Sequence, residues 1–102
     1  IISGVKKPFI PKNYLSSWAQ YSLLSNSEHK RDEIMSRLSE KNIPSMIYYK
    51  RPLHLQMAFK KLGYKKGDFP ISEKIASHIF SIPMHPYLDI DKQNRVIEVL
   101  NS

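Results

Sequence analysis

The chain has 102 residues, the length of one domain, which leaves no room for a second independent hydrophobic core. Hydrophobic residues make up 41% and charged residues 25%, so disorder and fibrous repeats are excluded as first interpretations. No apolar run approaches the roughly 18 residues that cross a bilayer. Cysteine is absent, which excludes disulfides, thiolate metal sites and cysteine nucleophiles. We expect a soluble, cytoplasmic protein with no membrane partner.

The net charge is +7 with the histidines neutral, which is enough to attract polyanions. The basic residues are scattered in pairs and form neither a long tail nor an arginine-rich arm. These pairs are Lys6-Lys7, Lys30-Arg31, Lys50-Arg51, Lys60-Lys61 and Lys65-Lys66. Scattered pairs are typical of a solubilising surface, but phosphate-bearing ligands and nucleic acid remain open on charge alone.

The first part of the chain predicts an extended segment followed by a strand. Residues 1–16 contain Pro8 and Pro11 and show little periodicity. Because the chain opens on Ile1 and not on an initiator methionine, we expect it to be processed or a fragment. Residues 17–24 alternate apolar and polar side chains, which predicts a strand.

A helix is predicted from about Glu28 to Lys41. Ser25 and Glu28 are spaced as a capping box, and Ser27 is an alternative N-cap. Asn42 stands where a left-handed residue closes a helix. The side chains expected on the buried face are Ile34, Met35 and Leu38.

Three further elements are predicted in the middle of the chain. Residues 45–49 are apolar and aromatic and predict a second strand. The apolar spacing over 55–62 predicts a second helix that ends at Gly63. Ser72 is expected to cap a third helix. The buried side chains expected in these two helices are Leu55, Ala58, Phe59 and Leu62 in the first, and Ile75, Ala76 and Ile79 in the second.

The last part predicts an edge strand and a helix. Residues 81–87 contain two prolines, which allow only an edge strand or an ordered extended segment. Asp89 or Asp91 starts the final helix. The order β-α-β-α-α-β-α predicts an α/β (α+β) fold with a small three-stranded mixed sheet covered by about four helices. Three other side chains are assigned to the core: Trp18, Tyr21 and Met84.

The common sequence signatures of metal, serine-nucleophile and phosphate-loop sites are absent. The four histidines include no pair at i, i+3 or i+4 and no adjacent group of carboxylates, so we predict no metal site. No Gly-x-Ser-x-Gly turn presents a nucleophile. The three glycines form neither a P-loop nor a dinucleotide-binding fingerprint. Any phosphate binding must therefore use side chains.

Two proline-containing segments, 48–54 and 84–87, concentrate polar and aromatic groups. Rigid loops that carry His, Tyr and Arg often present hydrogen-bond donors to anionic or sugar ligands. His54 and His85 are the candidate functional residues on this ground. The alternative is that Tyr48 and Tyr87 are core aromatics and that His54 caps the helix after it.

The same segments belong to an ordered set of motifs that covers nearly the whole chain from Trp18 onward. The motifs are Trp18-Ala19-Gln20-Tyr21, Ile43-Pro44-Ser45, residues 48–56, Gly67-Asp68-Phe69-Pro70 with Ser72-Glu73, and residues 82–88. This set resembles the C-terminal part of pyridoxal-phosphate (PLP) sugar aminotransferases of the DegT/StrS type. It is most similar to members that act on nucleotide-linked keto sugars, including UDP-linked 3-keto sugars of surface-polysaccharide pathways.

The resemblance implies a protein several times longer, in which a large N-terminal domain holds PLP. Residues 17–102 would be the small C-terminal domain of a fold-type I aminotransferase, and residues 1–16 the extended segment from the missing large domain. Family members move an amino group, usually from glutamate, onto a keto sugar, and we expect a homodimer at full length. The Schiff-base lysine and the other cofactor contacts belong to the large domain. The resemblance therefore implies no catalytic or cofactor-binding residue in this chain, which alone should be inactive.

For this domain the resemblance implies a role in closing one side of the active-site cleft. The candidate substrate-binding residues are Tyr49, Arg51 and His54 near the sugar nucleotide, with His85 and Tyr87 on the neighbouring segment. Arginine and histidine can pair with diphosphate or sugar hydroxyl oxygens. The rival interpretations are a free-standing basic module for nucleic acid, which would need basic residues gathered on one face, and a structural interaction domain.

Overall fold

The computed structural model describes residues 2–102, which form an α/β fold around one three-stranded sheet. Its strands are β1 (Val5–Lys6), β2 (Tyr21–Ser25) and β3 (Ile79–Ile82), in the order β1-β2-β3. β2 pairs antiparallel with both neighbours. The predicted fold class and number of strands are confirmed, but the sheet is antiparallel throughout and not mixed.

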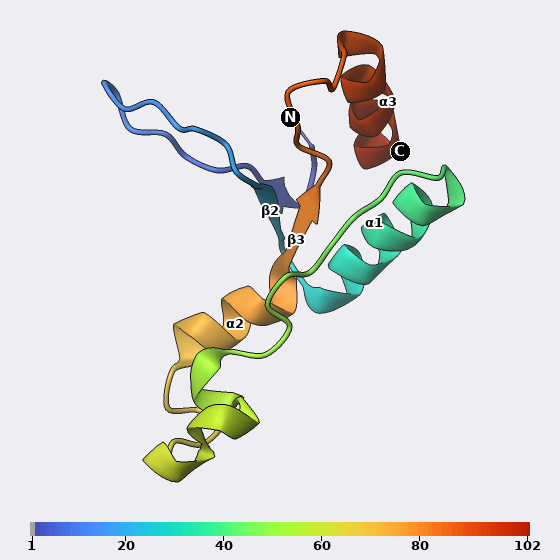
Figure 1. The fold of residues 1–102 in the computed structure, drawn as a ribbon. Helices are drawn as coiled ribbons and strands as arrows, with labels where there is room; N and C mark the ends of the chain where they lie inside the picture. The colour runs from blue at the N-terminus through green and yellow to red at the C-terminus, as the bar shows by residue number, and fades with distance from the viewer. Residues whose placement is uncertain (1) are drawn as a thin grey trace.

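Residues 2–102 also form three α-helices and two short 3₁₀ helices. They are α1 (Glu28–Glu40), α2 (Pro70–His78), α3 (Ile90–Asn101), η1 (Leu53–Leu55) and η2 (Met57–Leu62). In Figure 1, α1 and α3 lie to one side of the strands, while α2 and the green 3₁₀ segment lie beyond the lower end of β3. The helix predicted over 55–62 is a 3₁₀ helix, η2, over most of its length, and not the α-helix that the apolar spacing indicated. No η2 side chain is buried, so this segment lacks the apolar packing that stabilises an α-helix.

The predicted strand over 45–49 is wrong. Only Met46 pairs with β3, through two backbone hydrogen bonds with Ser81 of 3.0 and 2.7 Å. Tyr48 and Tyr49 are more than half exposed, so this segment has no buried face to extend the pairing. The third strand is β1 instead, within the predicted extended segment 1–16, whose Ile1 lies outside the described residues.

The boundaries around β3 also differ from the prediction. Ile79, expected on the buried face of the third helix, is the first residue of β3. The predicted extended segment 81–87 shares only two residues with this strand. β3 lies in antiparallel register with β2, where Leu23 opposes Phe80. The strand is therefore set by its pairing and by the burial of Phe80, neither of which the local pattern contains.

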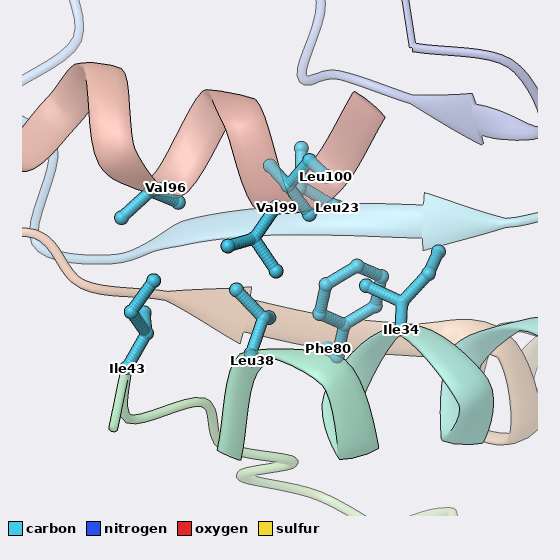
Figure 2. Packing of buried hydrophobic residues seen from close by; sticks show 8 residues of the cluster. All are labelled: Leu23, Ile34, Leu38, Ile43, Phe80, Val96, Val99 and Leu100. Atoms are coloured by element: carbon cyan, nitrogen blue, oxygen red, sulfur yellow. The ribbon is translucent and has the colours of Figure 1, made fainter. Parts of the chain in front are cut away.

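The core lies between the sheet and helices α1 and α3. Figure 2 shows Phe80 of β3 beside the side chains of α1, with the α3 side chains facing them. Phe80, Ile34 and Leu38 are fully buried, so the predicted α1 stripe is confirmed at Ile34 and Leu38, while its third member, Met35, is partly buried against the cluster. The cluster consists of Leu23, Ile34, Leu38, Ile43, Phe80, Val96, Val99 and Leu100.

The three further core assignments fare differently. Tyr21 packs against the core cluster, and its ring stacks on Trp18 with centroids 4.8 Å apart. Trp18 itself is only half-buried. Met84 is 38% exposed, so its assignment to the core is wrong. It follows Pro83, after β3 has ended, where the chain leaves the sheet.

The ends of α1 show how the sequence sets its limits. The Ser27 side chain accepts a hydrogen bond of 3.1 Å from the Lys30 N–H, so Ser27 is the N-cap and the capping box from Ser25 is wrong. The Ser25 hydroxyl instead donates to the His78 carbonyl at 3.0 Å, which joins β2 to the end of α2. Asn42 has φ 56°, which confirms the left-handed closing residue.

The other two α-helices begin in different ways. α3 starts after Asp89, whose carboxylate accepts a hydrogen bond of 2.9 Å from the Lys92 N–H, as one of the two alternatives predicted. α2 starts with Pro70 and has no side-chain cap, so the predicted Ser72 cap is wrong. Proline suits the first helical position because its fixed φ fits the helix and it has no N–H to leave unpaired.

Candidate functional site

A cavity of about 950 Å³ lies between η1, the loop before α2 and α2 itself. We call it the η1–α2 cavity. Most of its walls are apolar side chains, with a few polar groups among them, which is the usual make-up of a small-molecule site. One wall is formed by Tyr49, residues 51–53 and Gln56, the loop side by Asp68 and Phe69, and the α2 side by residues 70–72, Ile75, Ala76 and Ile79.

The structure brings two of the five candidate residues to this cavity. Tyr49 and Arg51 line it, and both are exposed. His54 is buried, at 9% exposure, in the helix that carries one wall. His85 lines a separate cavity of about 420 Å³ against the sheet and α3. Tyr87 is 85% exposed and lines neither cavity.

Arg51 offers the cavity a positive charge. Within residues 2–102 no ion pair engages its guanidinium. Its backbone carbonyl accepts a hydrogen bond of 3.1 Å from the Gln56 side chain, which holds this wall in place. Asp68 adds a negative charge to the same cavity, but its Oδ2 already accepts from the Lys65 N–H at 2.8 Å. A planar guanidinium suits two-point binding of phosphate or carboxylate.

Two contacts hold the side chain of His54, one with α2 and one with the loop before it. Its Nε2 lies 2.9 Å from Oε1 of Glu73 in α2. Its ring lies against Phe69, with centroids 4.8 Å apart and planes at 59°. The interpretation that His54 caps the helix after it is therefore wrong, because its side chain bonds to α2 and not to η2.

Glu73 is a residue to which the sequence motifs assigned no role. Its Oε1 also accepts from the Gly67 N–H at 2.8 Å. Partial burial acts to raise the pKa of Glu73, but the hydrogen bonds from Gly67 and His54 outweigh it and hold the pKa below its usual value. The sequence shows this carboxylate early in a predicted helix, six residues after Gly67, and the structure adds that Gly67 has φ +96°, which favours a turn.

The smaller cavity has a different character. Its lining includes Trp18, Tyr21 and His85 together with apolar side chains of the sheet and α3. Nδ1 of His85 accepts a hydrogen bond of 3.2 Å from the Tyr87 N–H, which orders the turn after Pro86. Trp18 has φ 50°, an uncommon conformation for a side chain of this size.

Residues 2–102 contain neither a cluster of metal ligands nor a membrane-spanning helix. No three histidine, aspartate or glutamate side chains gather as a set of metal ligands in this part of the chain. No helix in the same range is long and apolar enough to cross a bilayer.

The sequence profile of the DegT/DnrJ/EryC1/StrS aminotransferase family matches residues 3–101. The chain therefore belongs to this family, and the resemblance stated from its motifs is confirmed. The match begins before β1 and ends within the last turn of α3, so it includes the whole sheet and the η1–α2 cavity.

Individual relatives agree with the profile. The chain is 48% identical to the "Pleiotropic regulatory protein" of Geobacillus stearothermophilus over 68% of its residues. It is 43% identical over 72% to dTDP-3-amino-3,4,6-trideoxy-alpha-D-glucose transaminase of Micromonospora megalomicea. It is 34% identical over 84% to UDP-2-acetamido-2-deoxy-3-oxo-D-glucuronate aminotransferase of Pseudomonas aeruginosa. These matches cover 18%, 20% and 22% of the three relatives.

Solved structures show the same fold. A DegT/DnrJ/EryC1/StrS aminotransferase from Brucella abortus superposes with a TM-score of 0.82 at 44% identity, covering 95% of this chain and 25% of that one. DesV of Streptomyces venezuelae, solved in complex with a ketimine intermediate, superposes with a TM-score of 0.88 at 25% identity over 98% of this chain and 26% of its own. The chain thus spans about a quarter of these structures.

Proposed function

We propose that the full-length protein is a PLP-dependent aminotransferase that moves an amino group from glutamate to a nucleotide-linked keto sugar. The single observation that carries this proposal is the family match over residues 3–101. Relatives named as transaminases of dTDP-linked and UDP-linked sugars support the substrate class. A UDP-linked 3-keto sugar for surface polysaccharide is our proposed substrate, and the enzyme acts in the cytoplasm as a homodimer. Residues 17–102 form its small C-terminal domain, and residues 1–16 lead in from the large one.

The lysines of this chain do not fit the cofactor's needs. A lysine that bonds covalently to PLP acts from a site where burial or neighbouring charge lowers its pKa. Of the twelve lysines, eleven are exposed, and Lys30 forms an ion pair of 3.2 Å with Glu33 on the surface of α1. The proposal therefore assigns the cofactor-binding lysine to the rest of the enzyme and gives this chain a role in binding alone.

The proposed role of this chain is to bind the sugar nucleotide at the η1–α2 cavity. Arg51 would pair with diphosphate oxygens, because its guanidinium is exposed at the cavity and has no carboxylate partner within residues 2–102. Tyr49 presents an aromatic face and a hydroxyl beside it. His85 and Tyr87 remain predicted substrate contacts, and they lie outside this cavity.

The free-standing basic module for nucleic acid is less well supported. Such a module needs a face of unpaired basic side chains. Several lysines and arginines here instead pair with neighbouring carboxylates, which neutralise their charge locally. Arg31 pairs with Glu28 and Asp32, and Lys92 pairs with Asp89. Family membership supplies a specific alternative, and we therefore retain the aminotransferase proposal alone.

The test uses the full-length protein. Bound PLP should give an absorbance band that changes when glutamate is added and is restored when a nucleotide-linked keto sugar follows. UDP-linked and dTDP-linked 3-keto sugars are to be compared, since relatives of both kinds match. A protein that binds no PLP, or whose band does not respond to glutamate or any other amino acid, would contradict the proposal.

A further inference from the structure

The structure assigns to Glu73 a role as the positioning residue of the η1–α2 cavity, which it holds in shape through His54 and the Gly67 amide. The identity of the ligand, a nucleoside diphosphate, rests on the proposed function, whereas the contacts of Glu73 do not depend on it. The contacts of Glu73 also give His54 a role different from the predicted one. His54 would act on the ligand site through the wall that carries it, and not by touching the sugar nucleotide.

One carboxylate oxygen joins three elements of the cavity. Glu73 belongs to α2, His54 to η1 and Gly67 to the loop between η2 and α2. Oε1 of Glu73 is 2.9 Å from His54 Nε2 and 2.8 Å from the Gly67 nitrogen. Each of these three segments supplies residues to the lining of the cavity. The contacts of this oxygen therefore keep the walls of the cavity at a fixed distance from one another.

The two donors to Oε1 favour an ionised Glu73. An ionised carboxylate can only accept hydrogen bonds, so His54 must donate from Nε2 while the Gly67 N–H donates to the same oxygen. The lowered pKa of Glu73 is in keeping with this, because both bonds favour the ionised form. At neutral pH Glu73 is therefore the ionised acceptor that both donors favour.

Burial shields the pair from water. The side chains of His54 and Glu73 are only 7% and 17% exposed. Phe69 covers the ring of His54, and Tyr64 meets Phe69 edge-on with centroids 5.1 Å apart. Phe69 also lines the cavity. Movement of His54 would therefore move a side chain that faces the ligand.

Few other contacts hold these walls. Within residues 2–102, η2 has no buried side chain, and His54 is the only buried side chain of η1. Apolar packing usually fixes such segments, and here the fixed point is polar. Loss of one carboxylate should therefore loosen the loop and η1 together, while the sheet and its core stay intact.

The experiment compares four forms of the full-length protein: wild type, Glu73→Ala, Glu73→Gln and the control Glu33→Gln. Glu33 is a matched control because it also has a lowered pKa, held down by Lys30, but lies on α1 and lines neither the η1–α2 cavity nor the smaller cavity that His85 lines. Two quantities are measured in each form. The first is hydrogen exchange of the peptide covering 64–69, relative to peptides of α1. The second is the dissociation constant of UDP and of dTDP.

We expect Glu73→Ala to raise exchange in 64–69 about tenfold and to weaken UDP or dTDP binding about tenfold, the effect of losing one or two hydrogen bonds to a charged group. Glu73→Gln should restore most of both, because its amide oxygen can accept from the same two donors. Glu33→Gln should match wild type. If Glu73→Ala does not fold, His54→Phe replaces it, since that variant keeps an aromatic ring on Phe69 but removes the donor.

Three results would overturn the inference. One is exchange in 64–69 that is unchanged by Glu73→Ala. Another is an equal rise of exchange in 64–69 and in α1, which would mean general destabilisation. The third is nucleotide binding that stays unchanged although the loop has loosened. If wild type binds neither UDP nor dTDP and its PLP band ignores amino acids, the proposed function fails, and the exchange comparison alone still decides whether Glu73 holds the walls.

Discussion

Two regions of the chain are stabilised by different kinds of contact. The sheet with α1 and α3 contains seven of the eight members of the core cluster, and the eighth, Ile43, follows the end of α1. The segment 44–78, which we call the lobe and which includes η1, η2 and α2, buries only His54 and the small Ala76. The lobe is held by the contacts of Glu73, His54 and Phe69 instead. The difference indicates that the sheet region gives the chain its fold, whereas the lobe carries the η1–α2 cavity, where we propose that the ligand binds.

The two regions also differ in the side chains that they expose. The lobe exposes many large apolar side chains for its size, and several of them line the η1–α2 cavity. They include Tyr49, Leu53, Met57, Phe69, Ile71 and Ile75. Because so few of its residues are buried within this chain, the lobe of the chain taken by itself should change shape at a lower free-energy cost than the sheet region.

The largest expected effect comes from the core. Phe80→Ala removes a fully buried ring between β3 and α1 and should lower the free energy of unfolding by about 3–5 kcal/mol. Phe69→Ala in the lobe removes a ring that is 42% exposed and should cost much less. Denaturant unfolding of the full-length protein, followed by hydrogen exchange of β3 peptides, measures both. Equal losses for the two variants would contradict the division into two regions.

The junction between the regions should give the next effect. Arg31 of α1 is 7% exposed, donates to the Ser77 carbonyl of α2, and pairs with Asp32 at 2.7 Å. Arg31→Ala leaves that carbonyl without its donor and should cost about 1–3 kcal/mol. Hydrogen exchange should rise in α2 more than in α3. A rise confined to α1 would show that Arg31 serves its own helix and does not join the two regions.

A helix cap in the sheet region should give a smaller effect. Ser27→Ala removes the hydroxyl that accepts from the Lys30 N–H at the start of α1, which should cost about 1 kcal/mol. Ser27→Asp keeps an acceptor at this position and should be close to wild type. The free energy of unfolding is compared at pH 7. Nucleotide binding in the lobe should be the same in both variants, and a loss there would contradict the separation.

The smallest expected effect depends on pH. Hydrogen bonds from the Lys92 side chain and backbone N–H hold the pKa of Asp89 below its ordinary value of 3.8. A lowered pKa in the folded state means that the stabilisation is fully present above pH 3.8 and is lost as the pH falls through the lowered value. Asp89→Asn should be slightly less stable than wild type at pH 7 and equal to it in stronger acid. A difference that grows as the pH falls would contradict this sign.

Parts of the fold could be predicted because their signals are local. The spacing of Ile34 and Leu38 indicated the buried face of α1, and Asn42 marked its end. The strand β1 has two residues and exists only because it pairs with β2. The segment 45–49 has strand-like side chains, but only Ile47 packs against the core, while Met46, Tyr48 and Tyr49 are exposed. Strand pairing and burial by neighbouring elements are properties of the whole fold. Local patterns therefore missed β1 and wrongly predicted a strand over 45–49.

The candidate site shows the same limit. The sequence motifs led to Tyr49 and Arg51, which the structure places together at one cavity. They did not give Glu73 a role, because its partners lie 19 and six residues away and meet it only in three dimensions. The motifs also did not show that His85 lies away from the η1–α2 cavity. His85 follows the C-terminal end of β3, whereas α2 and the η1–α2 cavity lie at the N-terminal end of this strand.

The central claim is that this chain supplies the sugar-nucleotide side of an aminotransferase site, and Arg51→Ala in the full-length protein tests it most directly. Lys50→Ala is the matched control, because it removes the same charge from the neighbouring residue, which does not line the η1–α2 cavity. Amino transfer to the nucleotide-linked keto sugar should fall about tenfold or more in Arg51→Ala only, while the response of the PLP band to glutamate stays unchanged. An equal loss of both responses, or no loss of either, would contradict the claim.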